Sequence, residues 1–489
     1  MTDTTAASTN GSETTTQRLK PGSIGVAGIV FFVVAAAAPL GATLGAGPVV
    51  FIFGGAGAPA MYLIASIALL LFAFGFAAMS KYVTNAGGFA AYVTWGLGRK
   101  AGHAAAGVAV LAYLGMFLGI SGQFSVFAAE LADRFFGLSI PWQVFMLLGV
   151  VLVGALGYRD IRVSTVLLGV LLVLELLILL VFDIAVIAQG GAEGINFASF
   201  APSSVFSPTM GLALLFAFAC FVGFEATTLY GEEAKDPKKT VPRATYVAII
   251  VIGLTYGFTM WALALAYGTD SVQDAAIEDP VGFVLNATTQ YVGPWATIVM
   301  EVLVVTSLIA VLLSFHNALS RYVFSLGRVG FLPKALGRTH RKHGSPATAS
   351  IAVSIVILVL LVAFMLTGAD PFGVLFMWMV GLGTLGVLIL QASGAAAVIM
   401  YLRQHASQES LWSRIIAPLL GGILLTIAVV LAVMNFGVLI DAEGFVTVLL
   451  PALYLVSMAA GIIVGAVRNV EDLRHDYLPE ETHSPLNNT

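Results

Sequence analysis

The feature that most constrains this chain is a series of apolar runs, each about as long as a membrane-spanning helix, with short polar segments between them. A bilayer core is crossed by roughly 20 helical residues, and only helices or closed barrels satisfy their backbone hydrogen bonds inside it. We therefore predict an all-α integral membrane protein with about twelve transmembrane helices. The expected spans are residues 23–54, 58–79, 101–128, 141–157, 163–188, 208–231, 243–268, 294–319, 346–367, 373–402, 414–437 and 445–467.

The composition agrees with a membrane protein and excludes several other classes. Of the 489 residues, 59 % are hydrophobic and 10 % are charged, which is too little charge to cover a soluble chain of this size. The 52 glycines fit closely packed membrane helices. The single cysteine, Cys220, excludes an intramolecular disulfide and a cysteine-based metal site.

The basic residues predict how the chain is oriented in the membrane. With both termini on the cytoplasmic side, Arg134 is the only one of the 22 Lys and Arg residues that falls outside. Such an asymmetry is what the positive-inside rule describes. We expect a multi-pass protein of the cell (plasma) membrane with cytoplasmic N- and C-termini.

Two of the expected helices carry residues that interrupt a helix. The run 23–54 contains Pro39, which lacks a backbone donor, and the run 208–231 contains Gly223 close to Glu225. Taken singly, an ordinary proline kink and a close-packing glycine are the alternative interpretation. Each interruption, however, falls in the first helix of a five-helix set, and paired broken helices mark the binding site of a transporter.

Three segments resemble one family of transporters. They are GFEATTLYGEEAKDPKKTVPRA at 223–244, SRYVFSLGRVGFLPKALGRTHRKHGSP at 320–346 and NAGGFAAYV at 85–93. These segments are similar to signatures of the amino acid–polyamine–organocation superfamily, and the likeness covers about the whole chain. The matching residues are Glu232, Glu233, Asp236, Pro237, Pro242 and Arg243 in the first segment, and Ser320, Arg321, Gly330, Pro333 and Pro346 in the second.

The resemblance implies a LeuT-type fold, with two inverted repeats of five helices, two peripheral helices, and broken helices 1 and 6. The transport core is then expected at residues 23–402, with repeats at about 23–188 and 208–402. Helices 11 and 12 would occupy 403–467. A disordered cytoplasmic tail would form residues 1–22, and a second cytoplasmic tail residues 468–489.

The resemblance also implies that substrate binds between the two interruptions. Many relatives carry a Gly-Ser-Gly or Gly-Ala-Gly motif at the first one, whereas this chain has three alanines and a proline. The expected substrate-binding residues are Ala36, Ala37, Ala38, Pro39, Leu40, Gly41, Phe221, Val222, Gly223, Phe224 and Phe315. The candidates for an aromatic gate are Phe218, Phe221 and Phe224.

Titratable residues inside the spans are candidates for ion coupling, because a charged group in a bilayer is costly unless it faces the protein interior. Glu175 stands where several relatives have a lysine in a cation site, so we expect it to carry a proton. Glu225 and His316 are further candidates. For each of the three, a structural hydrogen bond is the alternative interpretation. Thr306, Ser307 and Ser314 are weak candidates for sodium ligands.

The predicted function is secondary active transport of amino acids by alternating access, most simply proton-coupled uptake. An amine, polyamine or amino-alcohol permease and a substrate exchanger are alternatives, and a channel or nutrient receptor is a remote one. We expect no enzyme activity, no cofactor beyond a coupling proton or sodium ion, no metal site, and no nucleic-acid partner. The expected partners are a small-molecule substrate and the lipid bilayer. The sequence leaves open the particular substrate, the coupling ion, the direction of flux and the oligomeric state.

Overall fold

The computed structural model describes residues 25–83, 88–158, 165–225, 227, 234–339, 346–405, 408–441 and 443–468. The expected N-terminal tail lies outside these residues, as does the C-terminal tail beyond Arg468. Glu232, Glu233 and residues 85–87 of the family-like segments also lie outside them. Every secondary-structure element in the described ranges is a helix, as expected for an all-α protein.

The first half of the chain forms helices close to the expected spans. The long helix α5 includes the expected run 101–128 and extends beyond both of its ends, whereas α9 is shorter than the expected run 208–231 and ends before Gly223. The helices that position the site are α1 (Val26–Ala37), α2 (Pro39–Gly54), α3 (Ala58–Met79), α4 (Gly88–Leu97), α5 (Arg99–Phe136), α6 (Trp142–Tyr158), α7 (Thr165–Gln189) and α9 (Met210–Ala219).

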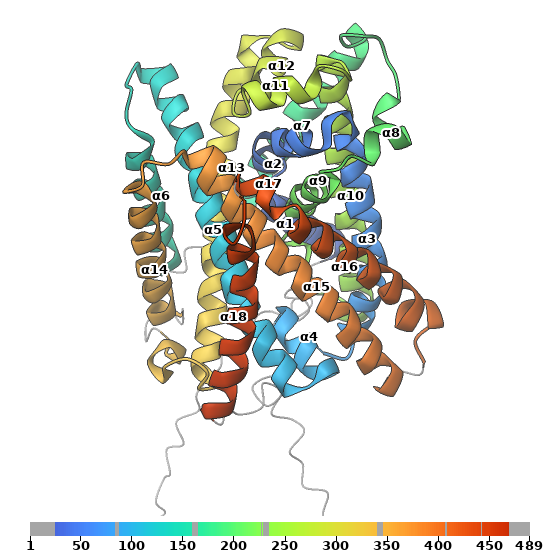
Figure 1. Cartoon of the computed structure of the whole chain (residues 1–489), viewed down its shortest axis with the longest axis vertical. Coiled ribbons are helices and arrows are strands. Elements are labelled where there is room, and N and C mark those ends of the chain that lie inside the picture. The colour runs from blue at the N-terminus through green and yellow to red at the C-terminus, as the bar shows by residue number, and fades with distance from the viewer. Residues whose placement is uncertain are drawn as a thin grey trace, which may run out of the picture.

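The second half follows the same plan. Its helices are α10 (Pro237–Tyr267), α11 (Val272–Glu278), α12 (Phe283–Tyr291), α13 (Pro294–Arg328), α14 (Ala347–Met365), the π-helical turn η5 (Pro371–Phe376), α15 (Met377–His405), α16 (Ala417–Met434) and α18 (Val446–Val467). The short helices α11 and α12 lie at one end of the molecule and α4 lies at the other (Figure 1).

Among the described residues, nine helical stretches are long and apolar enough to cross a bilayer. One of them, Pro39–Met79, contains both α2 and α3, and three shorter apolar helices lie at Val26–Ala35, in α6 and in α9. Each expected span therefore holds at least one of these helices. The chain is a multi-pass membrane protein.

Helices from the two halves pack in matching pairs. Helix α2 packs against α9, α3 against α10, α5 against α13, and α6 against α14. These are the first to fourth helices of one set against the first to fourth of the next, which is the pairing that two repeats related by a twofold axis produce. The pairing brings the interrupted helices of the two sets together near the middle of the bundle.

Candidate substrate site

The first interruption lies at Ala38, between α1 and α2. Helix α1 ends at Ala37, and Ala38 has φ 47° and ψ 75°, in the left-handed region that alanine rarely adopts. Pro39 then begins α2, where its fixed φ suits a first helical position and its missing N–H removes no hydrogen bond. We call the segment Ala37–Leu40 the first break. The predicted interruption at Pro39 is confirmed.

Three side chains from other helices bind the backbone around the first break. The carboxylate of Glu175, on α7, accepts a hydrogen bond from the Leu40 N–H (3.1 Å). The hydroxyl of Tyr256, on α10, donates to the Ala37 carbonyl (3.1 Å). The amide of Gln123, on α5, donates to the Gly41 carbonyl (2.7 Å). The first two partners satisfy groups that a continuous helix would have paired internally, and Gln123 adds a bond to a carbonyl inside α2.

A glycine makes the approach of Gln123 possible. A Cβ at Gly45, one turn along α2 from Gly41, would collide with the side-chain amide of Gln123. Gly45 therefore leaves the space that the Gln123 side chain needs to reach α2.

The second interruption follows α9. The helix ends at Ala219, residues Cys220–Gly223 form turns, and Gly223 has φ 113°, a conformation that side-chain-bearing residues avoid. We call the segment Cys220–Glu225 the second break. The carboxylate of Glu225 accepts hydrogen bonds from the Gly223 N–H (2.9 Å) and from the Tyr113 hydroxyl (2.9 Å). The interruption expected at Gly223 is confirmed, and Glu225 holds it in place.

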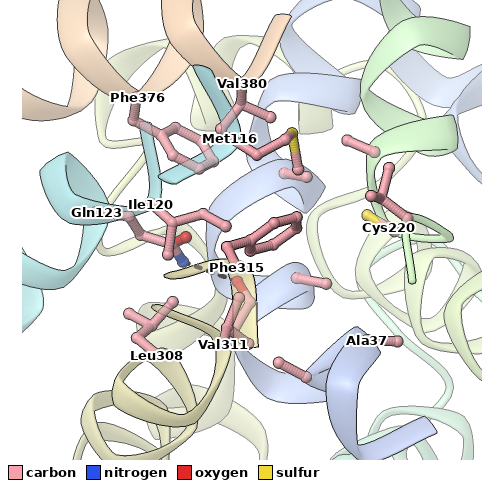
Figure 2. A pocket seen from close by; sticks show the side chains of 16 residues that line it. Ala37, Met116, Ile120, Gln123, Cys220, Leu308, Val311, Phe315, Phe376 and Val380 are labelled. Carbon is pink, nitrogen blue, oxygen red and sulfur yellow. Dashed lines mark hydrogen bonds between the residues drawn. The ribbon is translucent and has the colours of Figure 1, made fainter. Parts of the chain in front are cut away.

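A small cavity of about 50 Å³ lies between the two breaks (Figure 2). Its lining is almost wholly apolar. Among the lining residues, Gln123 alone has a side chain with an oxygen or nitrogen atom. The lining residues are Ala37, Ala38, Gly41, Ala42, Ala46, Met116, Ile120, Gln123, Ala219, Cys220, Val222, Leu308, Val311, Phe315, Phe376 and Val380. A buried apolar cavity with one fixed polar group is suited to a small molecule with an apolar part.

The expected substrate-binding residues divide into two groups. Ala37, Ala38, Gly41, Val222 and Phe315 line the cavity. The others surround it without lining it: Pro39, Leu40, Phe221, Gly223 and Phe224. The side chain of Ala36 lies outside the described part of the structure.

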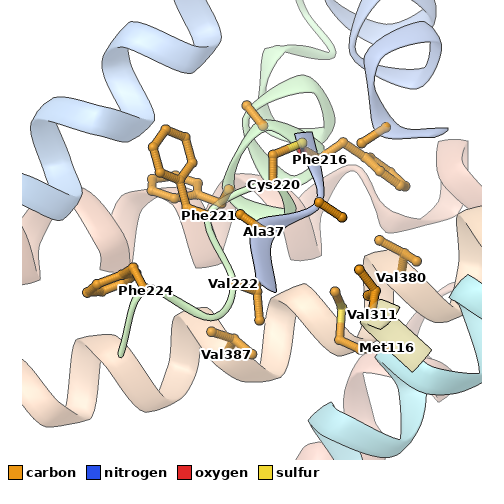
Figure 3. Packing of buried hydrophobic residues seen from close by; sticks show 14 of the residues in the cluster. Ala37, Met116, Phe216, Cys220, Phe221, Val222, Phe224, Val311, Val380 and Val387 are labelled. Atoms are coloured by element: carbon orange, nitrogen blue, oxygen red, sulfur yellow. Dashed lines mark hydrogen bonds between the residues drawn. The ribbon is translucent and has the colours of Figure 1, made fainter. Parts of the chain in front are cut away.

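The three phenylalanines expected to form a gate are buried beside the second break. Phe221 packs edge-on against Tyr256, with ring centroids 6.4 Å apart, and Phe224 packs edge-on against Phe72 at 6.3 Å. Figure 3 shows Phe221 and Phe224 on the side of the second break away from the cavity-lining Val311. Phe218 is also buried and does not line the cavity. The aromatic rings that do line it are those of Phe315 and Phe376.

The other coupling candidate, His316, points toward the neighbouring helices. Its Nε2 lies 2.9 Å from the Ser354 hydroxyl on α14, and its ring is 1 % exposed. Phe315, the residue before it, faces the cavity instead. Consecutive residues of a helix point in directions about 100° apart, so the two neighbours cannot both face the cavity.

The sodium candidates differ in what they contact. Thr306 and Ser314 each donate to a carbonyl of their own helix, at Leu303 (2.9 Å) and Ala310 (2.9 Å) respectively. Ser307 is buried on α13. Within the described ranges, no group of three His, Cys, Asp or Glu side chains is arranged to hold a metal ion.

Sequence reasoning missed several residues that shape the site. Tyr113 and Gln123 on α5, and Tyr256 on α10, bind the two breaks, yet none was expected to do so. A polar Gln123 within an apolar run was a signal that could have been used. Nothing in the sequence indicates that Tyr113 and Tyr256 reach these particular backbone and carboxylate atoms.

Paired broken helices around a buried cavity, within a multi-pass helical bundle, define a membrane transporter. Comparison with known proteins gives the family. A family model described as amino acid permease matches residues 24–466, and the chain belongs to this family. The superfamily resemblance seen in the sequence is thereby confirmed, and the protein is a permease rather than an enzyme.

Three characterised relatives illustrate the range of the family. The chain is 25 % identical over 339 residues to the branched-chain amino acid permease BcaP of Bacillus subtilis, covering 64 % of this chain and 69 % of the relative. It is 24 % identical over 311 residues to the low-affinity putrescine importer PlaP of Escherichia coli, covering 61 % and 66 %. It is 26 % identical over 321 residues to the methylthioribose transporter of B. subtilis, covering 62 % and 65 %. The matched regions thus span about two thirds of these relatives.

Proposed function

We propose that this protein takes up amino acids with small or medium apolar side chains by alternating access, driven by an inward proton gradient. The observation that carries the proposal is the contact between Glu175 and the Leu40 amide, beside an apolar cavity. This contact joins a titratable group on α7 to the helix that begins at the first break. It supplies a physical link between proton binding and the position of α2.

The substrate class follows from the lining of the cavity. Aliphatic and aromatic side chains such as Ile120, Leu308 and Phe315 would surround an apolar substrate side chain. Among the described lining residues there is no Asp or Glu to neutralise the second ammonium group of a diamine or the side chain of a cationic amino acid. A branched-chain amino acid permease is among the relatives, which agrees with this substrate class.

The coupling mechanism rests on the charge of Glu175. The N-terminus of a helix carries a partial positive charge and unpaired N–H groups, so it stabilises an ionised carboxylate. A protonated carboxyl accepts a weaker hydrogen bond and gains less from the helix dipole. Protonation of Glu175 therefore loosens its hold on α2, and α2 becomes free to move relative to α7.

Glu175 also competes with the substrate for the same kind of donor. Family resemblance leads us to expect a substrate carboxylate at the backbone amides of the first break. Glu175 already accepts the hydrogen bond from Leu40, and Pro39 has no N–H to offer. Gly41, the next residue of α2, lines the cavity and is the candidate donor for a substrate carboxylate. Protonated Glu175 releasing Leu40 would add a second donor.

A second candidate function is transport of an amine without a carboxylate. It is favoured by the same contact, because a carboxylate-binding amide already bonded to Glu175 is less available to a substrate. The putrescine importer among the relatives agrees with this alternative. Exchange of an internal for an external substrate is a further mode. In each case the protein would lie in the cell membrane with both termini in the cytoplasm.

Uptake into proteoliposomes tests the proposal. Radiolabelled leucine, lysine and putrescine are compared at equal concentration, with and without an inward proton gradient. We expect leucine to accumulate only with the gradient, and Glu175→Gln to abolish accumulation while leucine still binds. Preference for putrescine would establish the second candidate function. Accumulation that needs sodium or internal substrate, and ignores the proton gradient, would overturn the role of Glu175.

A further inference from the structure

A second carboxyl group lies on the same helix face as Glu175. Asp183 is eight residues further along α7, about 12 Å along the helix axis. The two side chains are 4 % (Glu175) and 3 % (Asp183) exposed. The opposite face of α7 presents large apolar side chains outward, including Leu177 (50 % exposed) and Ile184 (56 % exposed). Both carboxyl groups therefore face the protein interior and not the lipid.

Asp183 has few partners for so deeply buried an acid. The Thr259 hydroxyl, on α10, donates to its Oδ2 (3.0 Å). In the described part of the chain its Oδ1 has no hydrogen-bond partner and no solvent contact. No basic side chain of these ranges forms an ion pair with it. An acid buried in a membrane helix without a counter-ion is costly, and such residues mark ion and proton pathways.

The face of α10 that touches Asp183 leads back to the first break. Tyr256 lies one turn before Thr259 on α10, about 4.5 Å along the helix axis. Its hydroxyl binds the Ala37 carbonyl of the first break, whose Leu40 amide binds the Glu175 carboxylate. Helix α10 thus brings one hydroxyl to Asp183 and another to the first break, where Glu175 binds.

The other helices packed against α7 bring no competing charge to this row. Helices α1 and α2 contain no titratable side chain. On α13, Glu301 pairs with Arg134 of α5 (2.6 Å) and His316 contacts Ser354 of α14, so neither faces the row. At the end of α12, Tyr291 directs its hydroxyl to the Ala266 carbonyl.

We propose that Asp183 is a proton-transfer residue that takes protons from the outer side and delivers them to Glu175. The proposal rests on the proposed function, since it assigns a route for the coupling proton. Asp183 is six residues, about 9 Å, from Gln189, the end of α7 that the charge pattern predicts to face outside.

Each transfer conserves the proton. The Asp183 carboxylate accepts one proton from external water and becomes neutral. It then gives that proton to the Thr259 hydroxyl, the Thr259 hydroxyl passes its own proton to the Tyr256 hydroxyl, and the Tyr256 hydroxyl passes its own to the Glu175 carboxylate. Asp183 ends as a carboxylate, and Glu175 ends protonated.

A permanently protonated Asp183 that only hydrogen-bonds Thr259 is the structural alternative. Asparagine separates the two roles, because it matches a neutral carboxylic acid in shape and can still accept from Thr259, yet it carries no exchangeable acid proton at this pH. Glutamate restores the acid on a side chain longer by one methylene.

The experiment uses full-length protein in proteoliposomes that contain a pH-sensitive dye, with L-leucine as the probe. Three quantities are measured for the wild type and for Asp183→Asn: gradient-driven uptake, proton entry coupled to it, and leucine exchange with equal pH on both sides. We expect gradient-driven uptake and proton entry to fall about a hundredfold, as for loss of a positioned proton-transfer group. Exchange and leucine binding are expected to stay near wild type, and Asp183→Glu to recover part of the proton entry.

Asp133→Asn is the matched control, because Asp133 is an exposed acid near the end of α5 that contacts Ser139. It should leave all three quantities unchanged. Wild-type proton entry and pH profile in Asp183→Asn would overturn the relay and establish the structural role. Loss of exchange and binding together with uptake would also contradict it, since a relay acts on the proton alone. Failure of the wild type to couple leucine to protons would overturn the proposed function itself, and the relay with it.

Discussion

The first break and the second break border the same cavity, yet different parts of the molecule hold them. The first depends on side chains that come from three other helices: Glu175 on α7, Tyr256 on α10 and Gln123 on α5. The second is bound through its own Glu225, which accepts from Gly223 two positions earlier and from the Tyr113 hydroxyl of α5. In the described residues the first break is therefore tied to three other helices, whereas side-chain hydrogen bonds tie the second to α5 alone.

The backbone of the two breaks differs in the same sense. The first pairs an alanine at φ 47° with a proline, which restricts its conformations. The second uses a glycine at φ 113°, which has a wider choice of conformations. A stiff break bound to a titratable group on another helix is suited to sensing protonation. A glycine break with its own carboxylate is suited to act as a hinge.

The largest expected difference separates the two glutamates. In Glu175→Gln, uptake should lose its dependence on pH, and the roughly tenfold accumulation that one proton supports per pH unit should disappear. In Glu225→Gln, the amide can still accept from Gly223, so the pH dependence should persist with a lower rate. Uptake measured across a series of outside pH values checks both. Equal loss of pH dependence in the two variants would contradict the assignment of proton sensing to Glu175 alone.

Gly223→Ala tests the hinge. A side chain at φ 113° is strained, at a cost of about 1–3 kcal/mol, so we expect roughly tenfold slower transport and a lower melting temperature. Gly98→Ala is the control, because Gly98 has φ 90° with open space around it and lies away from the cavity. It should lower the melting temperature without slowing transport. A Gly223→Ala variant with wild-type transport would contradict the hinge.

Gln123→Leu removes the donor that reaches the first break from α5. The Gly41 carbonyl keeps its place in the hydrogen-bond pattern of α2 but loses the added bond from Gln123, at a cost of about 0.5–1.5 kcal/mol. We expect KM for leucine to rise severalfold while the pH profile keeps its shape. Ser121→Ala is the comparison, since Ser121 donates to a carbonyl of its own helix. Similar KM values for these two variants would show that Gln123 does not contribute to leucine binding.

The smallest effect is expected from Ala38→Gly. Glycine relieves the cost of about 1–2 kcal/mol for a left-handed alanine, but it also adds freedom to the unfolded chain. The net change in unfolding free energy should be within about 1 kcal/mol, with looser coupling because the first break is less stiff. Thermal unfolding and the ratio of leucine to proton entry check this. A large fall in stability would mean that the Cβ of Ala38 makes contacts that the first break requires.

Much of the fold was predictable because it follows from local chemistry. The expected run 58–79 coincides with α3, and the expected run 445–467 differs from α18 by one residue. Apolar length predicts a membrane helix directly, because a bilayer imposes one structure on any such run. Pro39 and Gly223 are interruptions for backbone reasons that each residue carries by itself.

Membership of the cavity was predictable only in part, because it depends on which way each side chain points after packing. Phe315 lines the cavity whereas Phe221 and Phe224 do not, although all three are phenylalanines near the expected site. Gln123 and Tyr256 were not expected at the first break at all. Their partners are 82 and 219 residues away in sequence, and no local pattern specifies such pairs.

The sequence by itself determined a multi-pass helical bundle, the places where two of its helices break, and the buried acids that such a bundle must accommodate. The tertiary structure alone decided that Glu175 reaches the Leu40 amide, that Glu225 closes its own turn, and that Asp183 shares a helix face with Glu175. The physical reason is one of range. Apolar length and backbone geometry act within a single helix, whereas a hydrogen bond between helices exists only after both have been packed at a particular depth and rotation.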